Sequence, residues 1–234
     1  MKETTAVERS IPTPAKHREK LTRERVIEAA LRIMDGEGLD AVSMRRVAHE
    51  LGVEAMSLYN HVGDKEELLD GICEQVMGDF EFPALTGDWV EDCRGGARAW
   101  RRLMQKHPGV IELFARQRGP ATTIESMRPS EFALRLLRES GLSDRDVAQA
   151  FHAIGGYIQG FVVMERGSIA GGTDAVHVKA HQALAESLDP DEFEALRAVA
   201  PHFADCSPDE QFEFGLDLLI QGLVAKVGEP PRRR

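Results

Sequence analysis

The segment that most restricts the fold is residues 42–69, which read VSMRRVAHELGVEAMSLYNHVGDKEELL. Two short helical patterns lie on either side of Gly52, because a glycine in the left-handed conformation can end one helix and turn the chain sharply. The second pattern, over about residues 54–61, sets polar and aromatic side chains beside the inward-facing Leu58 and Val62. A short helix held at a sharp angle to its neighbour suits the major groove of DNA.

The rest of the chain repeats apolar residues at helical spacing, with no internal repeat and no alternation typical of strands. These patterns predict an all-α fold. The longest pattern, over residues 144–166, is interrupted by Gly155, Gly156 and Gly160, which suggests that another helix or a ligand comes close there. Pro129 is expected to kink or divide the helix that carries it. Residues 175–187 and 190–204 give weaker helical patterns.

The distribution of charge matters more than the net charge of −10. Of the 29 basic and 39 acidic residues, 11 of each lie in residues 1–65, so the remaining 169 residues hold 18 and 28. An acidic body repels DNA, and binding should therefore rest on specific contacts and depend on salt. The three cysteines lack metal-ligand spacing, and no run approaches the roughly 20 apolar residues of a membrane span. A cytoplasmic protein with no membrane partner and no cofactor is expected.

The side chains around Gly52 supply the groups that a DNA-reading helix needs. Arginine, lysine and tyrosine can bind phosphates, while serine and asparagine can also bind base edges. The alternative is a small helical bundle with a merely polar face. The predicted DNA-binding residues are Arg45, Arg46, Ala55, Met56, Ser57, Tyr59, Asn60, His61 and Lys65.

The run LGVEAMSLYNHVGDKEELLD closely resembles the DNA-binding domain of TetR family transcriptional regulators, and this resemblance extends over residues 22–77. Trp89, Arg128-Pro129, the stretch from Gly155 to Glu165 and the run FEFGLDLLIQGL resemble the C-terminal domain of the tetracycline repressor. The resemblance implies an N-terminal three-helix helix-turn-helix domain followed by a larger helical domain for ligand binding and dimerisation. The expected divisions are a flexible tail (1–20), the DNA-binding domain (21–82), the ligand-binding and dimerisation domain (83–228) and a tail (229–234).

The resemblance also implies a homodimer on a palindromic double-stranded DNA operator. In the family the last two long helices form a four-helix bundle, and both candidates here have wide apolar faces with small residues. The alternative is that these stripes belong to the core of one chain. The predicted interface residues are Phe151, Gly155, Ile158, Phe212, Leu216, Leu219 and Leu223.

The family's effector pocket implies a third set of residues, each of which could equally belong to the core. They are Trp100, Met104, His107, Phe114, Gln117, Met127, Tyr157, Phe161, Met164 and Glu165. Phe114 stands where the tetracycline repressor has a magnesium-binding histidine, so Glu165 lacks its imidazole partner and no metal site is predicted. A small hydrophobic or aromatic effector is expected instead of metal-chelated tetracycline.

Three other functions remain as alternatives to a ligand-responsive repressor. An activator, or a DNA-binding co-regulator without a ligand, would share the same N-terminal segment. An enzyme is the least supported, because the chain has no glycine-rich phosphate loop and neither Ser168 nor Cys206 has an evident base partner.

Overall fold

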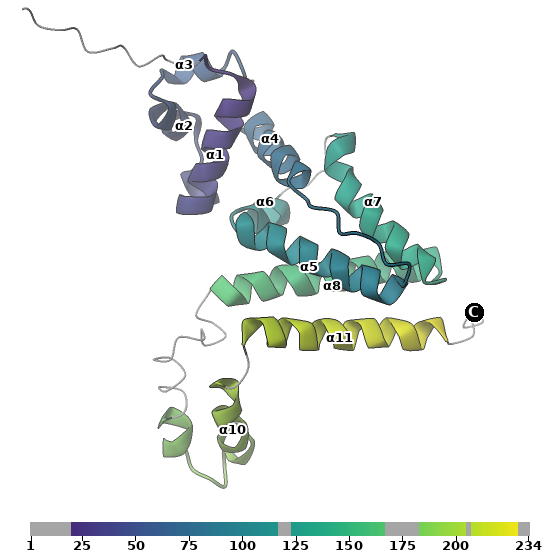
Figure 1. Cartoon of the computed structure of the whole chain (residues 1–234). Helices are drawn as coiled ribbons and strands as arrows, with labels where there is room; N and C mark the ends of the chain where they lie inside the picture. The colour runs from purple at the N-terminus through teal and green to yellow at the C-terminus, as the bar shows by residue number, and fades with distance from the viewer. Residues whose placement is uncertain (1–19, 117–122, 167–182, 205–206, 229–234) are drawn as a thin grey trace, which may run out of the picture.

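The computed structural model describes residues 20–116, 123–166, 183–204 and 207–228, and these ranges contain helices and no strands (Figure 1). The prediction of an all-α fold is confirmed. The helices are α1 (Arg23–Glu37), η1 (Leu39–Ala41), α2 (Met44–Leu51), α3 (Ala55–Leu58), α4 (Lys65–Gly78), α5 (Trp89–Lys106), α6 (Val110–Arg116), α7 (Ile124–Glu139), α8 (Asp144–Arg166), α10 (Glu194–Val199), η3 (Ala200–Ala204) and α11 (Pro208–Val227).

Three of the expected segments fall wholly or partly outside the described residues. The tails lie outside them apart from residue 20, and of the expected helix 175–187 only 183–187 is described, as a helical segment. The expected helix 190–204 is represented by α10 and η3.

Most helices begin where a polar side chain caps the first turn. Thr22, Ser43 and Asp64 each accept a hydrogen bond from the backbone N–H three residues later, at 3.3, 3.2 and 2.8 Å. Each bond satisfies a donor that has no partner inside the helix. Local sequence therefore sets the start of α1, α2 and α4.

Helix α7 is continuous through Pro129, so the expected division of this helix does not occur. Thr123 and Ser126 form a reciprocal capping box at its start. The proline ring is buried. Its packing offsets the backbone hydrogen bond that a proline inside a helix cannot donate.

Helix α4 lies between the DNA-reading end of the molecule and the body. It packs against α1 on one side and against α7 on the other (Figure 1). One hydrophobic core contains residues of α1, α2, α3 and α4 together with residues of the body, including Met104, Val110 and Leu113. A movement of α4 relative to the body therefore changes the position of the whole N-terminal unit.

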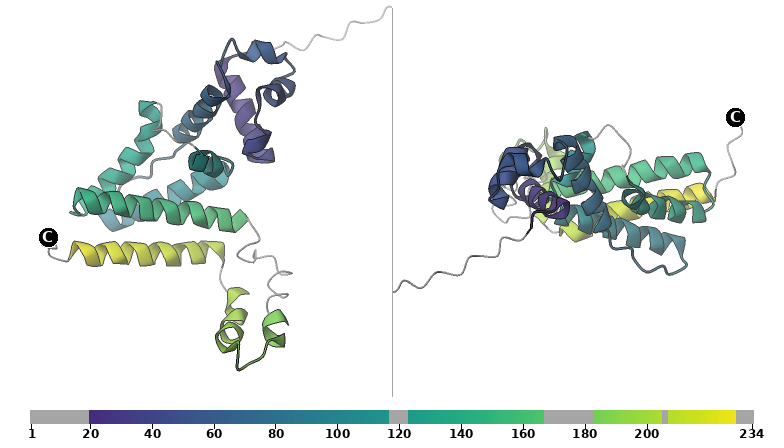
Figure 2. Two further views of the ribbon diagram at one scale, coloured as in Figure 1. Left: turned by 180° about the vertical axis from the view of Figure 1, so that it is seen from behind. Right: turned by 90° about the horizontal axis from the view of Figure 1, so that it is seen from above.

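Helices α5, α8 and α11 form the lower part of the body, with α8 and α11 running side by side (Figure 2). A second core fills the space between them and includes the fully buried Phe212, Leu216 and Ile220 of α11. Arginines spaced along α5 also meet acidic residues along α11. The pairs are Arg94–Asp217, Arg98–Glu213 and Arg101–Asp209.

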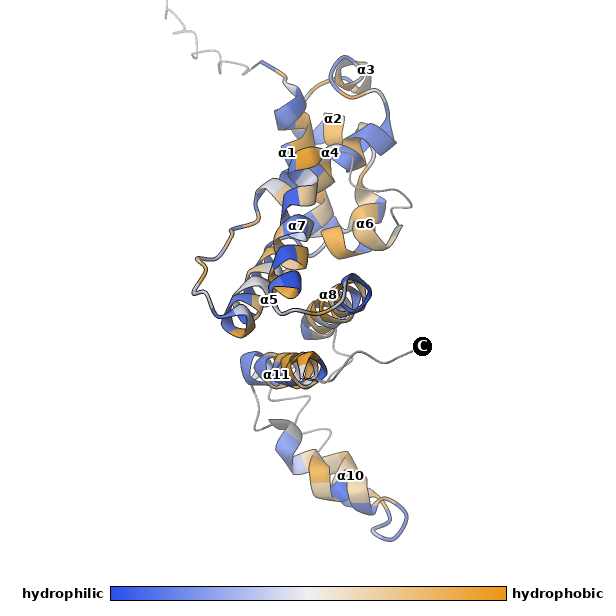
Figure 3. Cartoon of the chain, turned by 90° about the vertical axis from the view of Figure 1, so that its right-hand side faces the viewer, coloured by the Kyte–Doolittle hydropathy of each residue, from blue (hydrophilic) through white to orange (hydrophobic). Residues whose placement is uncertain are grey.

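The outer faces of α8 and α11 remain exposed and partly apolar, as the end-on view in Figure 3 illustrates for α11. By length and composition alone, one described helix, α8 over Asp144–Glu165, could cross a membrane, but this is weak evidence. Only 22% of its most apolar window is buried within the chain. An exposed apolar face of this extent on a helix indicates a binding partner that covers it.

Candidate DNA-binding surface and ligand cavity

The turn between α2 and α3 has the geometry expected from the sequence. Gly52 adopts φ 65° and ψ 35°, a left-handed conformation that favours glycine, and the N–H of Val53 donates to the carbonyl of Ala48 at 3.0 Å. Leu58 and Val62 are buried and anchor α3 against the core of the N-terminal unit. The opposite side of α3 faces solvent.

The short α3 ends earlier than the sequence indicated. The helix covers Ala55–Leu58 instead of residues 54–61, and the next residues form a turn in which His61 N–H donates to Leu58 O at 2.8 Å. Tyr59 and Asn60 are therefore presented from a turn, beside an exposed Met56. Ser57 and His61 are half-buried, and Ala55 packs partly against the core.

The cations of this surface differ in what they contact. Arg45 and Lys65 are exposed, and neither forms an ion pair with any described residue. Arg46 is held by Glu37 at 2.5 Å and by Glu50 at 3.0 Å. The structure thus leaves Arg45 and Lys65 available to phosphates, whereas Arg46 joins α2 to the end of α1. This placement of Arg46 differs from the predicted DNA contact.

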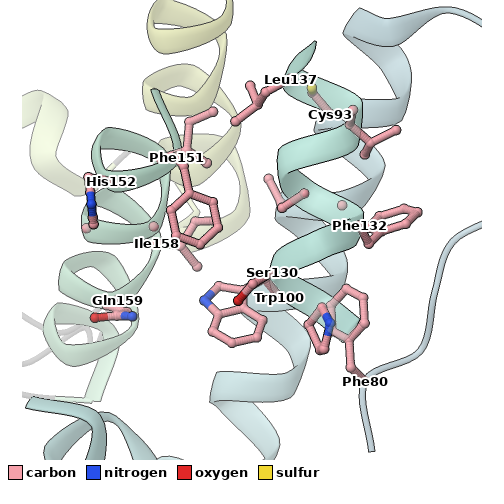
Figure 4. A pocket seen from close by; sticks show the side chains of 18 residues that line it. Phe80, Cys93, Trp100, Ser130, Phe132, Leu137, Phe151, His152, Ile158 and Gln159 are labelled. Atoms are coloured by element: carbon pink, nitrogen blue, oxygen red, sulfur yellow. The ribbon is translucent and has the colours of Figure 1, made fainter. Parts of the chain in front are cut away.

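A cavity of about 300 Å³ lies between α5, α7 and α8 (Figure 4). Phe80, Trp100, Phe132 and Phe151 give it an aromatic wall. Few polar groups reach it, among them Ser130, His152 and Gln159. It is further lined by Cys93, Gly96, Ala97, Pro129, Ala133, Leu136, Leu137, Ile154, Gly155, Gly156 and Ile158. Its size and lining suit a mostly apolar ligand oriented by a few hydrogen bonds.

The cavity borders the helix that leads from the DNA-reading turn. Phe80 follows α4 by two residues, and its ring lies 6.0 Å from that of Trp100 and 6.2 Å from that of Phe132, centre to centre. Phe82 extends this cluster and meets Phe132 edge-on at 5.3 Å. The cavity wall and the end of α4 therefore share one packed aromatic cluster.

Of the predicted effector residues, Trp100 lines the cavity. Met104 is fully buried in the first core, and Phe114 stacks on Trp100 with ring centres 6.3 Å apart. Tyr157 and Phe161 pack against Phe212.

Gln117 lies outside the described residues, and the other four predicted effector residues also lie apart from the cavity. Met127 and Met164 are exposed. His107 contacts two carboxylates near the N-terminal unit, while Glu165 pairs with Arg101. In the described part of the chain, no three His, Cys, Asp or Glu side chains are placed to hold a metal ion.

The predicted interface residues also lie in different environments: some in the core, some at the cavity and some partly exposed. Ile158, Phe212 and Leu216 are at most 2% exposed within one chain, so they belong to its core and have almost no surface to offer a second copy. Phe151 and Gly155 line the cavity. Leu219 and Leu223 are half-buried. The stripe read from the sequence is the inward face of α11, and exposed residues such as Phe214 and Leu218 lie on its other side.

Sequence reasoning missed most of the cavity wall, including Phe80, Phe132, His152 and Gln159. Gly155 and Gly156, which were expected to allow a helix or a ligand to come close, line the cavity, and a Cβ added at either would meet no atom within 4 Å. Cys93 also faces the cavity, where burial, with smaller contributions from Asp92 and Glu139, raises the pKa of its thiol to about 12. A thiol in this state stays protonated and behaves as a small apolar group.

An exposed helix-turn-helix on a helical body with its own apolar cavity defines a class of protein, the DNA-binding regulators with a separate ligand-binding domain. The chain belongs to the TetR family of bacterial regulatory proteins: residues 26–72 match the family's DNA-binding region, and residues 82–227 match the tetracycline repressor-like C-terminal domain. It is therefore a DNA-binding transcriptional regulator, and its family is not one of enzymes.

Curated relatives match along most of their length. The chain is 34% identical to the transcriptional repressor DrrR1 of Streptomyces coeruleorubidus, over 89% of this chain and 79% of that protein. It is 30% identical to the class A tetracycline repressor of Escherichia coli, over 92% and 98%. Among solved structures, Streptomyces coelicolor ActR in complex with actinorhodin shares 33% identity with a TM-score of 0.76, over 90% of this chain and all of that one.

Proposed function

We propose that the protein is a cytoplasmic, homodimeric repressor that leaves a palindromic operator when a small hydrophobic or aromatic molecule occupies the cavity between α5, α7 and α8. The observation that carries this proposal is the position of the cavity. Its wall includes Phe80, which directly follows the helix that begins beside the DNA-reading turn. Binding of a ligand in the cavity and the position of the DNA-binding helix are thereby linked through a few packed side chains.

The chemistry of the wall supports an aromatic effector. Its area is mostly apolar, and aromatic rings from α5, α7 and α8 face a few donors and acceptors. Such a wall favours a planar ring system with a small number of polar substituents. ActR, which this chain resembles, was solved with actinorhodin bound. Metal-chelated tetracycline fits less well, because Glu165 is already paired with Arg101.

The outer faces of α8 and α11 support a dimer. Ala153, Gly156 and Gly160 are exposed along α8, while Phe214 and Leu218 are exposed on α11. Small residues on one helix allow the close approach of another, and a two-fold axis would pair both helices into a four-helix bundle. This pairing also accounts for an apolar α8 in a protein without a membrane partner.

A two-fold dimer would place its two DNA readers about 34–36 Å apart, one turn of DNA. Arg45 and Lys65 would grip phosphates, and Ser57, Asn60 and Met56 would face base edges from the exposed side of α3 and its turn. Tyr59 and His61 would add contacts to the backbone. Arg46 would support this surface from behind through its bonds to Glu37 and Glu50.

Release follows if the effector binds one orientation of α4 more tightly than the other. A coupling of about 1–3 kcal/mol, which changes operator affinity roughly 5- to 150-fold, is typical of such proteins. Helix α4 packs against both α1 and α7, so a shift of the cavity wall can turn the N-terminal unit.

The test begins with an operator selected from randomised duplex DNA and then measures its affinity with and without actinorhodin and other planar aromatics. The variant Ala133→Trp fills the cavity from α7 and is expected to keep operator binding but lose the response. Glu131→Trp, on the same helix but outside the cavity wall, is the matched control and should respond normally. If aromatic compounds that stabilise the protein release DNA equally from the wild type and from Ala133→Trp, the cavity is not the effector site.

A further inference from the structure

The turn between α5 and α6 contacts the N-terminal unit through a buried histidine. His107, the last residue before Pro108, is 7% exposed. Its Nδ1 lies 2.9 Å from Oδ2 of Asp35 in α1, and its Nε2 lies 3.2 Å from Oδ2 of Asp79 at the end of α4. One side chain of the body thus touches two helices of the DNA-binding unit near their C-terminal ends.

Both ring nitrogens face carboxylate oxygens. An ionised carboxylate only accepts hydrogen bonds, so a ring nitrogen bonds its carboxylate only when that nitrogen carries the proton. Asp79 has a second partner, the ammonium of Lys106 at 2.6 Å, and Lys106 followed by His107 lowers the pKa of its carboxyl. Oδ1 of Asp35 is buried without a hydrogen-bond partner, so this carboxyl contacts the ring of His107 through Oδ2 alone.

A second contact in the same turn is independent of charge. A Cβ added to Gly109 would lie 2.6 Å from Cγ and 2.7 Å from the carbonyl oxygen of Met34, distances that real side chains do not tolerate. The turn backbone therefore lies directly on the last turns of α1, beside Asp35. The contact of His107 with Asp35 and the close approach of Gly109 to Met34 both join the α5–α6 turn to the end of α1.

We propose that His107 is a positioning residue: its ring clasps the ends of α1 and α4 to the α5–α6 turn and fixes the orientation of the DNA reader on the body. The N-terminal unit is then held by the shared hydrophobic core, by the α4–α7 contact and by this clasp. In a dimer, the orientation of each unit sets the distance between the two readers. The inference rests on the proposed dimeric operator for its effect on DNA, but the clasp itself is formed within one chain.

The test compares operators whose half-sites are one or two base pairs closer together or further apart than in the operator selected by the wild-type protein. The wild type is expected to prefer its own spacing by about tenfold or more, within the range typical of coupled sites. The double variant His107→Asn with Asp35→Asn removes the imidazole ring together with the carboxyl of Asp35 that it contacts. We expect this variant to remain folded and to discriminate spacings less than about threefold.

The control variant is Lys106→Met, which removes the exposed partner of Asp79 and leaves His107 in place. It should keep the wild-type preference for spacing. The clasp is refuted if the double variant also keeps that preference, or if Lys106→Met loses it to the same degree. A wild-type protein that binds only isolated half-sites would instead refute the proposed dimeric operator and, with it, any effect of the clasp on spacing.

Discussion

Replacing Arg101 by methionine is expected to destabilise the body much more than the same replacement at Arg98, one turn earlier in α5. Arg101 is 7% exposed and bonds to the carboxylate of Glu165 in α8, which is also largely buried. Its guanidinium lies 4.4 Å above the ring centre of Phe212 and 2.8 Å from the exposed Asp209. Arg98 binds Glu213 through two bonds of 2.7 Å, but the side chains of this pair are 43% and 36% exposed.

The expected magnitudes follow from burial. Removing one partner of a buried ion pair costs about 3–5 kcal/mol, because it leaves an uncompensated charge. The lower end applies here, since Glu165 keeps 15% of its side-chain exposure and accepts a bond from Gln105 at 3.2 Å. The methionine regains part of the lost ring contact. An exposed pair such as Arg98–Glu213 contributes about 0–1 kcal/mol.

Urea unfolding followed by circular dichroism measures the difference, because urea does not screen charges. Protein concentration must be fixed, since dimerisation would shift the apparent stability. We expect a loss of about 3 kcal/mol for Arg101→Met, or roughly 6–12 °C in Tm for a chain of this size. Adding Glu165→Leu should restore most of the loss, because the stranded charge is then gone.

The reasoning fails if the two single variants lie within about 1 kcal/mol of each other, the range of an exposed pair. It also fails if Glu165→Leu lowers stability further in the Arg101→Met background. Either result would mean that the interactions of Arg101 with its neighbours in α11, and not its buried bond to Glu165, set its contribution.

Three further predictions concern the surfaces of the protein. Arg45→Ala should weaken operator binding and lower the salt slope by about one, since it removes one phosphate contact, whereas Arg46→Ala should leave the slope unchanged because its guanidinium is bound to acidic residues. Cys93 should resist maleimide at pH 8 in the folded protein and react after unfolding, because a thiol with a pKa of about 12 is about one part in ten thousand ionised; rapid labelling of the native protein would contradict its burial. Phe214→Glu and Leu218→Glu should shift the protein to monomer in sedimentation velocity without unfolding it, and an unchanged dimer would place the interface elsewhere.

Local sequence signals were sufficient for the N-terminal unit. Thr22, Ser43 and Asp64 mark the starts of their helices, because an N-cap bond joins residues only three apart. Gly52 ends α2 for an equally local reason, its left-handed backbone. The length of α3 was overestimated, because the side chains that follow it carry no marker that separates a turn from a last helical turn.

The body shows where sequence reasoning stops. An apolar stripe predicts that one face of a helix is covered, but not whether the same chain or a second copy covers it. Phe212 and Leu216 were therefore expected at an interface, and the tertiary structure buries them within one chain. Most of the cavity wall was not predicted for a similar reason, since aromatic residues that line an open space and those that fill a core have identical periodicity.

The sequence by itself determined the helices, the DNA-reading turn around Gly52 and the family, because these depend on contacts between near neighbours and on a long stretch of matching residues. Only the tertiary structure decided which charges meet. His107 reaches Asp35 and Asp79 across 72 and 28 residues, and Arg46 pairs with Glu37 at the end of α1. Such pairings depend on how the helices pack. The spacing of these residues along the chain does not indicate that their side chains meet.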